Sequence, residues 1–518
     1  MAAAPADVAI GDECVGPFPS WADVKADFGA VGDGKADDTQ AIQAALLSIR
    51  PQSTPRRVLY IPAGTYRITG TLRLERVAHH DPLGIAIVGE DPQTTSLKWD
   101  GPAGRSMLFY DAWYASISRL TLDGAGKAKT AIQHGPSFAT ANECVDMIVK
   151  DVEFGIEAGF RDGIAETAVL RCRFYRCAKA AISIQGFNSL DWYIWGCWFE
   201  DCGIGASNEF RAGNFHVYYS TFLRSKDADI TLRHTGYFSF LGNTSIGSRR
   251  FFHAKRADNW KDTETWGAQA TLQDNLILDP TGAVPVSIEN NGPILLLDNT
   301  LRAAAQGPLV VNRPPTDQSD LIPVGNRWTA AKALDVKGRV TDLDNRVVKV
   351  ADIADARPQP VPFAERRGRP VIEVPPGAGT AEFQAAITQA AALKGQRARA
   401  ATPRRSRGWR CSRARRRGTA ITRPVCRSMT CARAGGCWCA TSGTRATPGA
   451  WCTSGIAASS PTTPASSPPP TASPINSTGR GSCAGGSRPS SSTASRARWP
   501  SPCSVRPPPC GSRRPARS

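Results

Sequence analysis

The final 121 residues of the chain, Ala398–Ser518, lack eight of the twenty amino acids: Lys, Asp, Glu, Leu, Phe, Tyr, His and Gln. The missing large apolar residues exclude a packed core there, because nothing would offset the entropy lost on ordering. The segment does contain 21 Arg and 9 of the 15 Cys. The first 397 residues therefore hold 42 basic and 45 acidic residues, so the net charge of +18 arises in the final segment. That charge is no evidence for a nucleic-acid partner.

Two interpretations of the final segment stay open. A natural tail rich in Arg, Ser, Pro and Ala would be disordered. Alternatively, reading a GC-rich gene one base late turns Leu codons into Cys or Trp codons, Asp codons into Thr codons and Ala codons into Arg codons. Such a frameshift accounts for the missing Leu, Phe and Asp, for the surplus Cys and Arg, and for four Trp in the segment. The composition favours the frameshift, and sequencing the gene around the codons for Gly395–Ala401 would test it.

Targeting and membrane signals are also missing from the chain. Residues 1–16 show neither a basic start nor an apolar stretch of the kind that secretory signals contain. No run approaches the roughly 20 apolar residues that a membrane span requires. The sequence therefore predicts a soluble chain without a membrane partner.

The first patterned region predicts a helix followed by two strands. Asp37 and Gln40 have the spacing of a capping box, which predicts a helix that ends at about Ile49. The runs 58–61 and 64–68, separated by a Pro-Gly turn, predict two short strands. The apolar stripe of the helix consists of Ile42, Ala45, Leu46 and Ile49.

From about Ser116 the chain repeats itself every 23 to 25 residues. The blocks 170–177 and 195–202 align at an offset of 25, and blocks that begin at Tyr218 and Leu241 each follow 23 residues later. Each repeat holds two or three short β-rich runs without helical periodicity. Periods of this length are typical of solenoids, so the sequence predicts a parallel β-helix.

The segment 21–46, with Tyr60-Ile-Pro-Ala-Gly-Thr-Tyr66 after it, resembles the N-terminal region of the pectate-lyase-like, right-handed parallel β-helix superfamily. That group includes rhamnogalacturonases, epimerase-like proteins, tandem β-helix exo-β-1,3-glucanases and phage tailspikes. The resemblance covers residues 20–345. It implies an all-β, right-handed parallel β-helix whose open end is closed by an N-terminal cap helix. The motif is structural and indicates no single reaction.

The sequence predicts five regions. An unstructured N-terminus covers 1–19, the β-helix covers 20–350, and a Pro-rich linker covers 351–380. Residues 381–397 repeat the pattern of the first helix and predict the start of a second β-helix cap, before the tail 398–518. This tandem arrangement resembles the exo-β-1,3-glucanases, and that resemblance implies that the catalytic acid lies on the second module.

Two sets of repeated residues predict ladders inside the solenoid. Four cysteines lie one repeat apart in pairs, and a zinc site and a stack of reduced thiols are the alternatives. Stacked strands lie about 4.8 Å apart with parallel Cβ directions, which favours buried, metal-free thiols over disulfides. These cysteines are Cys172, Cys177, Cys197 and Cys202. A turn-stabilising asparagine ladder is predicted at Asn243, Asn275, Asn299 and Asn326.

Two tryptophans receive different predictions. Trp195 shares the strand parity of Cys197 and is expected in the core. Trp198 is expected to point outward, where its ring would suit a pyranose face.

Ionisable residues gather on the second strand of successive repeats. The repeat offsets place Glu209 in one column with Ile184 and Leu232. Glycoside hydrolysis needs two carboxylates, whereas a lyase needs a base and a cation that neutralises a uronate. A solvated charged face is the open alternative. The predicted catalytic residues are Glu209, His234 and His253, and the predicted substrate-binding residues are Arg211, Arg233, Lys255 and Trp198.

The resemblance implies a carbohydrate-active protein that cleaves glycosidic bonds of an extracellular polysaccharide, as glycoside hydrolases do. In this form the protein would be inactive if the acid lies on a second module. The alternatives are a non-catalytic polysaccharide-binding or structural solenoid, and a polysaccharide lyase or epimerase. The expected partner is a polysaccharide, with no nucleic acid, membrane, cofactor or metal, and the chain is expected to be a monomer. The family implies an extracellular or periplasmic location.

Overall fold

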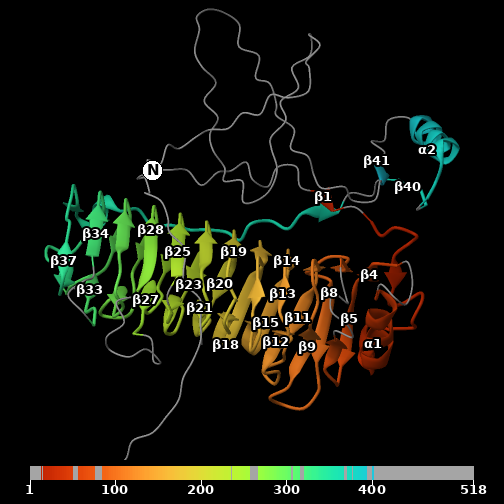
Figure 1. The fold of residues 1–518 in the computed structure, drawn as a ribbon, viewed down its shortest axis with the longest axis horizontal. Coiled ribbons are helices and arrows are strands. Elements are labelled where there is room, and N and C mark those ends of the chain that lie inside the picture. Colours follow the sequence, from red (N-terminus) through yellow and green to blue (C-terminus); the bar gives the residue numbers. More distant parts are fainter. Residues whose placement is uncertain are drawn as a thin grey trace, which may run out of the picture. The chain divides into compact units, whose positions relative to one another are not determined.

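The computed structural model describes residues 13–401, except 15, 51–55, 76–83, 210, 235, 257–266, 305–306, 316–319, 367–369, 376 and 394–398. Within them, parallel strands stack coil upon coil into a right-handed β-solenoid (Figure 1). The predicted fold class is confirmed. Most of residues 1–19 and nearly all of the predicted tail lie outside the described residues, and the five predicted regions remain predictions.

Each coil contributes strands to three columns. The first column is a sheet of parallel strands: β2 (Ala22–Asp23), β4 (Val58–Ile61), β7 (Ala86–Gly89), β10 (Ser116–Ser118), β14 (Glu143–Val145), β17 (Ala168–Leu170), β19 (Trp192–Trp195), β22 (Phe215–Tyr218), β25 (Gly236–Leu241), β28 (Ala268–Gln273), β31 (Ile294–Leu297), β34 (Asp320–Val324) and β37 (Arg339–Val340).

The second column follows the first after a tight turn in most coils. It consists of β3 (Asp33–Asp37), β5 (Gly64–Ile68), β8 (Thr95–Trp99), β11 (Thr121–Asp123), β15 (Ile148–Ala158), β18 (Arg173–Ile184), β20 (Trp198–Glu200), β23 (Thr221–Leu223), β26 (Thr244–Ile246), β29 (Leu276–Leu278), β32 (Thr300–Arg302), β35 (Arg327–Trp328) and β38 (Arg346–Val347).

The third column shares the long strands β15 and β18 with the second. Its other members are β6 (Leu72–Leu74), β9 (Ser106–Tyr110), β12 (Thr130–His134), β21 (Ile204–Asn208), β24 (Ala228–Leu232), β27 (Phe252–Ala254), β30 (Val286–Ile288), β33 (Val310–Asn312) and β36 (Leu334–Val336).

Apolar side chains from all three columns fill the interior and stack between coils. Phe174, Phe199 and Phe222 occupy one register, with ring centroids 5.1 and 4.6 Å apart in nearly parallel planes. Offset stacking of this kind adds to the free energy gained by burying the rings. Repetition of one residue type at one register therefore stabilises neighbouring coils against each other.

Helix α1 (Thr39–Ser48) covers the N-terminal end of the solenoid. Ile42, Ala45, Leu46 and Ile49 are buried, which confirms the predicted apolar stripe. The predicted capping box is wrong, because the N-cap is Asp38 and its side chain makes no capping bond. Its carboxylate accepts the backbone N–H groups of Val31 and Gly32 instead. The neighbouring Asp37 accepts the N–H of Thr39 at 3.0 Å.

The asparagine ladder is confirmed at the turns between the first and second columns. The side-chain amide of Asn275 donates to the carbonyl of Phe240 and to Oδ1 of Asn299, both at 2.9 Å. Its own Oδ1 accepts the N–H of Asn243 at 2.9 Å. The ladder continues beyond the predicted set to Asn345.

The cysteine ladder is confirmed as well. All four predicted thiols are buried and free. Cys144 is also buried but lies outside the ladder, because it pairs with Val169 in the first column and Met147 occupies the position one coil before Cys172. Burial raises the pKa of Cys172 well above the usual thiol range, which keeps it protonated.

After the last coil the chain turns back along the solenoid. Residues 350–366 begin with a short 3-10 helix, η1 (Val350–Asp352), and end at β39 (Glu365–Arg366), which pairs with β1 (Glu13–Cys14) at the N-terminal end. Figure 1 shows this segment in teal along the solenoid. The remaining described elements are β40 (Val371–Glu373) paired with β41 (Arg399–Ala401), the helix α2 (Thr380–Ala392), and β13 (Ala139–Thr140) paired with β16 (Ile164–Ala165).

Among the described helices, neither is long and apolar enough to cross a membrane.

Candidate functional site

Polar side chains directly follow the strands of the third column on successive coils. The backbone N–H of Glu209 donates to the carbonyl of Ile184, the last residue of the strand one coil before, and Lys255 donates likewise to Leu232. Neighbouring positions are therefore about 4.8 Å apart. We call this set the charged row: Gln185, Glu209, Arg233, Lys255, Glu289, Arg313 and Lys337.

The predicted alignment of Glu209 was wrong by one residue. Ile184 pairs with Asn208, so Glu209 is level with Gln185 and Arg233 rather than with Ile184 and Leu232. The repeat length explains the slip. Arg173 pairs with Trp198 in the second column, an offset of 25, whereas Ile184 pairs with Asn208, an offset of 24. A slip of one residue moves every side chain to the opposite face of a strand.

Glu209 forms an ion pair with the next member of the charged row. Its Oε2 lies 2.6 Å from Nε of Arg233, and both side chains are about three-quarters covered. Desolvation raises the pKa of Glu209, while Arg233, the Ser207 hydroxyl and Lys255 act in the opposite direction. The carboxyl therefore holds its proton more readily than an exposed glutamate does. The Arg233 guanidinium contacts it, and Lys255 acts on it electrostatically.

His253 lies one coil further along and is hydrogen-bonded at both ring nitrogens. Arg250 Nη1 lies 2.7 Å from Nδ1, and Oε1 of Glu289 lies 3.1 Å from Nε2. Desolvation lowers the pKa of His253, and the charges of Arg250 and Lys255 lower it further against the opposing effect of Glu289. The imidazole is therefore neutral near pH 7.

Asp227 joins these groups into one network. Its carboxylate lies 3.7 Å from Nζ of Lys255 and 3.9 Å from Nη1 of Arg250. Lys255 in turn acts electrostatically on both Glu209 and His253. We call the network the charged cluster: Glu209, Asp227, Arg233, Arg250, His253, Lys255 and Glu289.

The structure brings four of the predicted site residues into this cluster, namely Glu209, Arg233, His253 and Lys255. His234 is 5% exposed and immediately follows Arg233. Arg211 is exposed, with a left-handed backbone φ of 66°. Trp198 belongs to the second column, is 7% exposed, and donates its indole N–H to Glu200 at 2.9 Å, so little of its ring surface is open to a ligand.

A second polar row runs beside the charged row on the third column. The strand register aligns Gln133, Glu157, Ser183, Ser207, Thr231, His253 and Ser287, one on each coil. Sequence reasoning missed Glu157, which is 2% exposed, accepts a hydrogen bond from Thr130 at 2.5 Å and lies 3.4 Å from Lys129. It also missed Arg250. The offset of 24 places Thr231 in this row, whereas Glu157 lies 26 residues before Ser183, after a register shift between Val152 and Phe154.

No group of three or more His, Cys, Asp or Glu side chains in the described part of the chain is arranged to hold a metal ion. The charged cluster instead offers three kinds of group in contact: carboxyls, a neutral imidazole and three cations. Such a set can bind an anionic ligand and move a proton next to it.

Comparison with known proteins agrees with this fold. Residues 21–169 match the family model described as rhamnogalacturonase A/epimerase, pectate lyase-like. This segment is a pectate lyase-like β-helix. The resemblance predicted from the sequence is thereby confirmed at the level of the superfamily.

Two curated relatives of this chain come from Azotobacter vinelandii. Alginate lyase 7 is 36% identical over 105 residues, which make up 19% of this chain and 12% of that protein. Mannuronan C5-epimerase AlgE5 is 35% identical over 105 residues, or 19% of this chain and 10% of the epimerase. The chain thus spans about a tenth of the length of these relatives.

Solved structures also include folds similar to this one. PfbA, a surface adhesin of Streptococcus pneumoniae, matches with a TM-score of 0.49 and 15% identity over 63% of this chain and 90% of that chain. The A-module of mannuronan C-5 epimerase AlgE4 from Azotobacter vinelandii matches with a TM-score of 0.45 and 17% identity over 67% and 100%. The likeness concerns the fold, and no functional argument rests on it.

Proposed function

We propose that the charged cluster binds an acidic polysaccharide built from uronate sugars and moves a proton at the carbon that carries the carboxylate. One observation carries this proposal. Glu209, a carboxyl with a raised pKa, lies 2.6 Å from Arg233 and in the electrostatic field of Lys255. Proton abstraction beside a carboxylate requires a nearby base and a cation that neutralises the substrate's charge. The cluster supplies both.

The arrangement suits a chain that lies along the solenoid. Members of the charged row repeat about every 4.8 Å, so successive coils present separate groups to successive sugars. Arg233 and Lys255 are adjacent in the row and would neutralise the uronate at the reacting position, and Arg313 lies two coils beyond Lys255. Names of the curated relatives, an alginate lyase and mannuronan epimerases, agree with a uronate polymer as the substrate.

Lyase and epimerase reactions share the same first step in this scheme. A base removes the proton beside the carboxylate, and the cations stabilise the negative charge that develops on the carboxylate. A lyase then expels the glycosidic oxygen, which leaves an unsaturated sugar, whereas an epimerase returns a proton to the other face of the ring. We assign proton transfer to Glu209 and to the neutral His253, which both lie in the field of Lys255.

Glycosidic-bond hydrolysis, the reaction that the sequence resemblance implied, is the second candidate. The raised pKa of Glu209 favours it, because a general acid must hold its proton. Hydrolysis also needs a second carboxylate within about 5–10 Å. Glu289 lies three coils from Glu209 in the charged row, about 14 Å along the axis. Asp227 is then the remaining partner, because Lys255 contacts it and acts on Glu209.

Product analysis on three polymers tests the proposal. The chain is incubated with polymannuronate, polygalacturonate and β-1,3-glucan, and products are followed by ultraviolet absorbance of unsaturated ends, by NMR of epimerised sugars and by reducing ends. We expect activity on a uronate polymer that Glu209→Gln lowers about 10²–10⁴-fold. Glu200→Gln is the matched control, because Glu200 pairs with Arg224 on the second column.

The other outcomes are equally informative. Reducing ends without unsaturated or epimerised product, lost in Asp227→Asn, would establish hydrolysis instead. Activity that Glu209→Gln leaves intact would overturn the assignment of this site. Binding of a uronate polymer without turnover, weakened by Lys255→Gln, would identify the solenoid as a binding module. The expected extracellular location belongs to the same proposal.

A further inference from the structure

The segment 350–366 is held on the solenoid by a series of arginines at widely separated coils. At the C-terminal end, Arg302 donates to the carbonyl of Ile353 at 2.9 Å and pairs with Asp355 at 2.7 Å. In the middle, Arg173 donates to the carbonyl of Val361 at 3.0 Å and lies over the ring of Phe363, 3.8 Å from its centroid.

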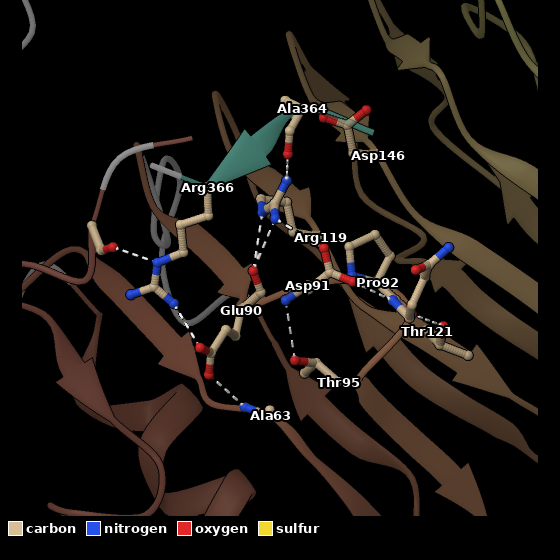
Figure 2. Close-up of polar contacts among 12 residues, drawn as sticks. Ala63, Glu90, Asp91, Pro92, Thr95, Arg119, Thr121, Asp146, Ala364 and Arg366 are labelled. Atoms are coloured by element: carbon tan, nitrogen blue, oxygen red, sulfur yellow. Dashed lines mark hydrogen bonds and ion pairs between the residues drawn. The ribbon is translucent and has the colours of Figure 1, made fainter. Parts of the chain in front are cut away.

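The N-terminal end of the segment is held more densely (Figure 2). Buried Arg119 donates to the carbonyl of Ala364 at 2.6 Å and also to the carbonyl of Glu90 at 3.0 Å. Arg366, from the segment itself, lies 2.9 Å from Oε1 of Glu90. It also donates to the hydroxyl of Tyr60 at 2.8 Å. Its Nε donates to the carbonyl of Gly16 at 2.8 Å.

These contacts have a common chemistry. The arginines of the solenoid capture main-chain carbonyls, which an extended chain presents at regular intervals. Pro358, Pro360 and Pro362 fix the backbone φ and supply no N–H, so the segment is already extended before it binds. The segment therefore loses little conformational entropy when it lies along the coils.

We propose that residues 350–366 are a strap that couples the stability of the two ends of the solenoid. In a bare solenoid each coil contacts only its neighbours, so the terminal coils open independently of each other. The strap contacts the coils of β4, β7, β18 and β32 at once, and these coils do not all touch one another. Opening at either end then requires the strap to loosen, which weakens its hold on the other end.

Hydrogen exchange on the full chain tests the coupling. The variant Phe363→Ala/Arg366→Ala removes the two strap side chains that grip the N-terminal half. We expect amide exchange at least about fivefold faster in β4 and β7, and also faster in β31 and β34 near the opposite end. Arg67→Ala is the matched control: it breaks an ion pair of 2.9 Å with Asp100 near the N-terminal end, away from the strap, and should act only locally.

A second variant keeps every contact residue and changes only the length of the strap. Insertion of Gly-Ser-Gly-Ser between Pro358 and Gln359 leaves the arginine contacts available but lets each half of the strap loosen separately. We expect amide exchange in β31 and β34 to become independent of Arg366→Ala in this background. If the distant strands are unaffected by Phe363→Ala/Arg366→Ala, or if the insertion leaves the long-range effect unchanged, the strap does not couple the ends.

Discussion

Arg250 Nη1 lies 2.7 Å from Nδ1 of His253, and an arginine can only donate. Nδ1 therefore accepts, the ring proton is on Nε2, and Nε2–H points to Glu289 at 3.1 Å. Arg250 thus fixes one tautomer of a neutral histidine in the charged cluster. Without that arginine both the tautomer and the charge of the ring would be open to change.

Removing Arg250 should raise the pKa of His253. The positive charge of Arg250 lowers that pKa, whereas Glu289 raises it, so Arg250→Gln shifts the balance towards the protonated ring. NMR titration of the imidazole measures the shift. Arg249→Gln is the control, since Arg249 lies at the same 3.9 Å from Asp227 as Arg250 does, whereas Arg250 is the arginine that contacts Nδ1 of His253. Equal titration curves for both variants would contradict the arrangement.

Acid should destabilise the fold through His134. This side chain lies inside the solenoid between Tyr110 and Trp192, and burial lowers its pKa to about 3. Because the folded-state pKa is below the ordinary value of about 6.5, its contribution to stability is complete above pH 6.5 and is lost as the pH falls towards 3. At pH 5 the loss amounts to about 2 kcal/mol.

Denaturant unfolding at pH 7 and pH 5 measures this loss. In His134→Gln the difference between the free energies of unfolding at pH 7 and pH 5 should shrink by about 2 kcal/mol. His216→Gln is the comparison, because burial also lowers the pKa of His216 but that ring is only partly covered. A pH dependence unchanged by His134→Gln would show that the buried ring is not the titrating group.

The middle of the asparagine ladder should be more sensitive than its end. Asn275→Ala removes an acceptor for the N–H of Asn243 and a donor to the carbonyl of Phe240, both buried. Each unsatisfied group costs about 1–3 kcal/mol, so we expect a loss of about 3 kcal/mol or more in the free energy of unfolding. Asn345→Ala, at the partly buried end of the ladder, should cost clearly less. Equal losses would mean that the ladder does not act through burial.

The buried thiols should be unreactive until the protein unfolds. A thiol reagent should leave Cys172 unmodified in the native state and label it in denaturant, because the protonated buried thiol is a poor nucleophile. Cys172→Asp places an unpaired carboxylate in the core and should destabilise by several kcal/mol, more than Cys172→Ala. Rapid native labelling, or an aspartate that costs no more than alanine, would be inconsistent with the ladder.

The sequence predicted the fold because the core repeats. Asn299, Cys197 and Phe199 each have a residue of the same type one coil away. The side of a strand on which a residue lies was harder to predict. Trp195 was expected in the core, but Gly196 follows it with φ of 62°, and this left-handed turn breaks the alternation before Cys197. Trp195 is partly exposed and packs against Tyr218 and Tyr219 on the outside.

The candidate site was predicted only in part, for a related reason. Glu209, Arg233, His253 and Lys255 were identified by their chemistry, but their partners depend on turns whose lengths vary. Asp227 and Arg250 precede their strands rather than follow them, and the offset of 25 hides Glu157. Asp229 shows the same limit inside the solenoid, where burial raises its pKa to about 7 and Ser245 donates to it at 2.5 Å. No periodic pattern in the sequence predicts a buried carboxyl of this kind.

The repeat offset changes from 25 in the second column to 24 in the third column. Mutations are constrained differently in these two parts of the molecule. One residue fewer between β20 and β21 than along β18 leaves the second column paired at an offset of 25 and the third column at 24. A change of length that this bend absorbs leaves both faces of the following strand in place, whereas one that reaches the strand would exchange its inner and outer faces. The bend between β20 and β21 is therefore a place where this scaffold can vary in length without rebuilding its core.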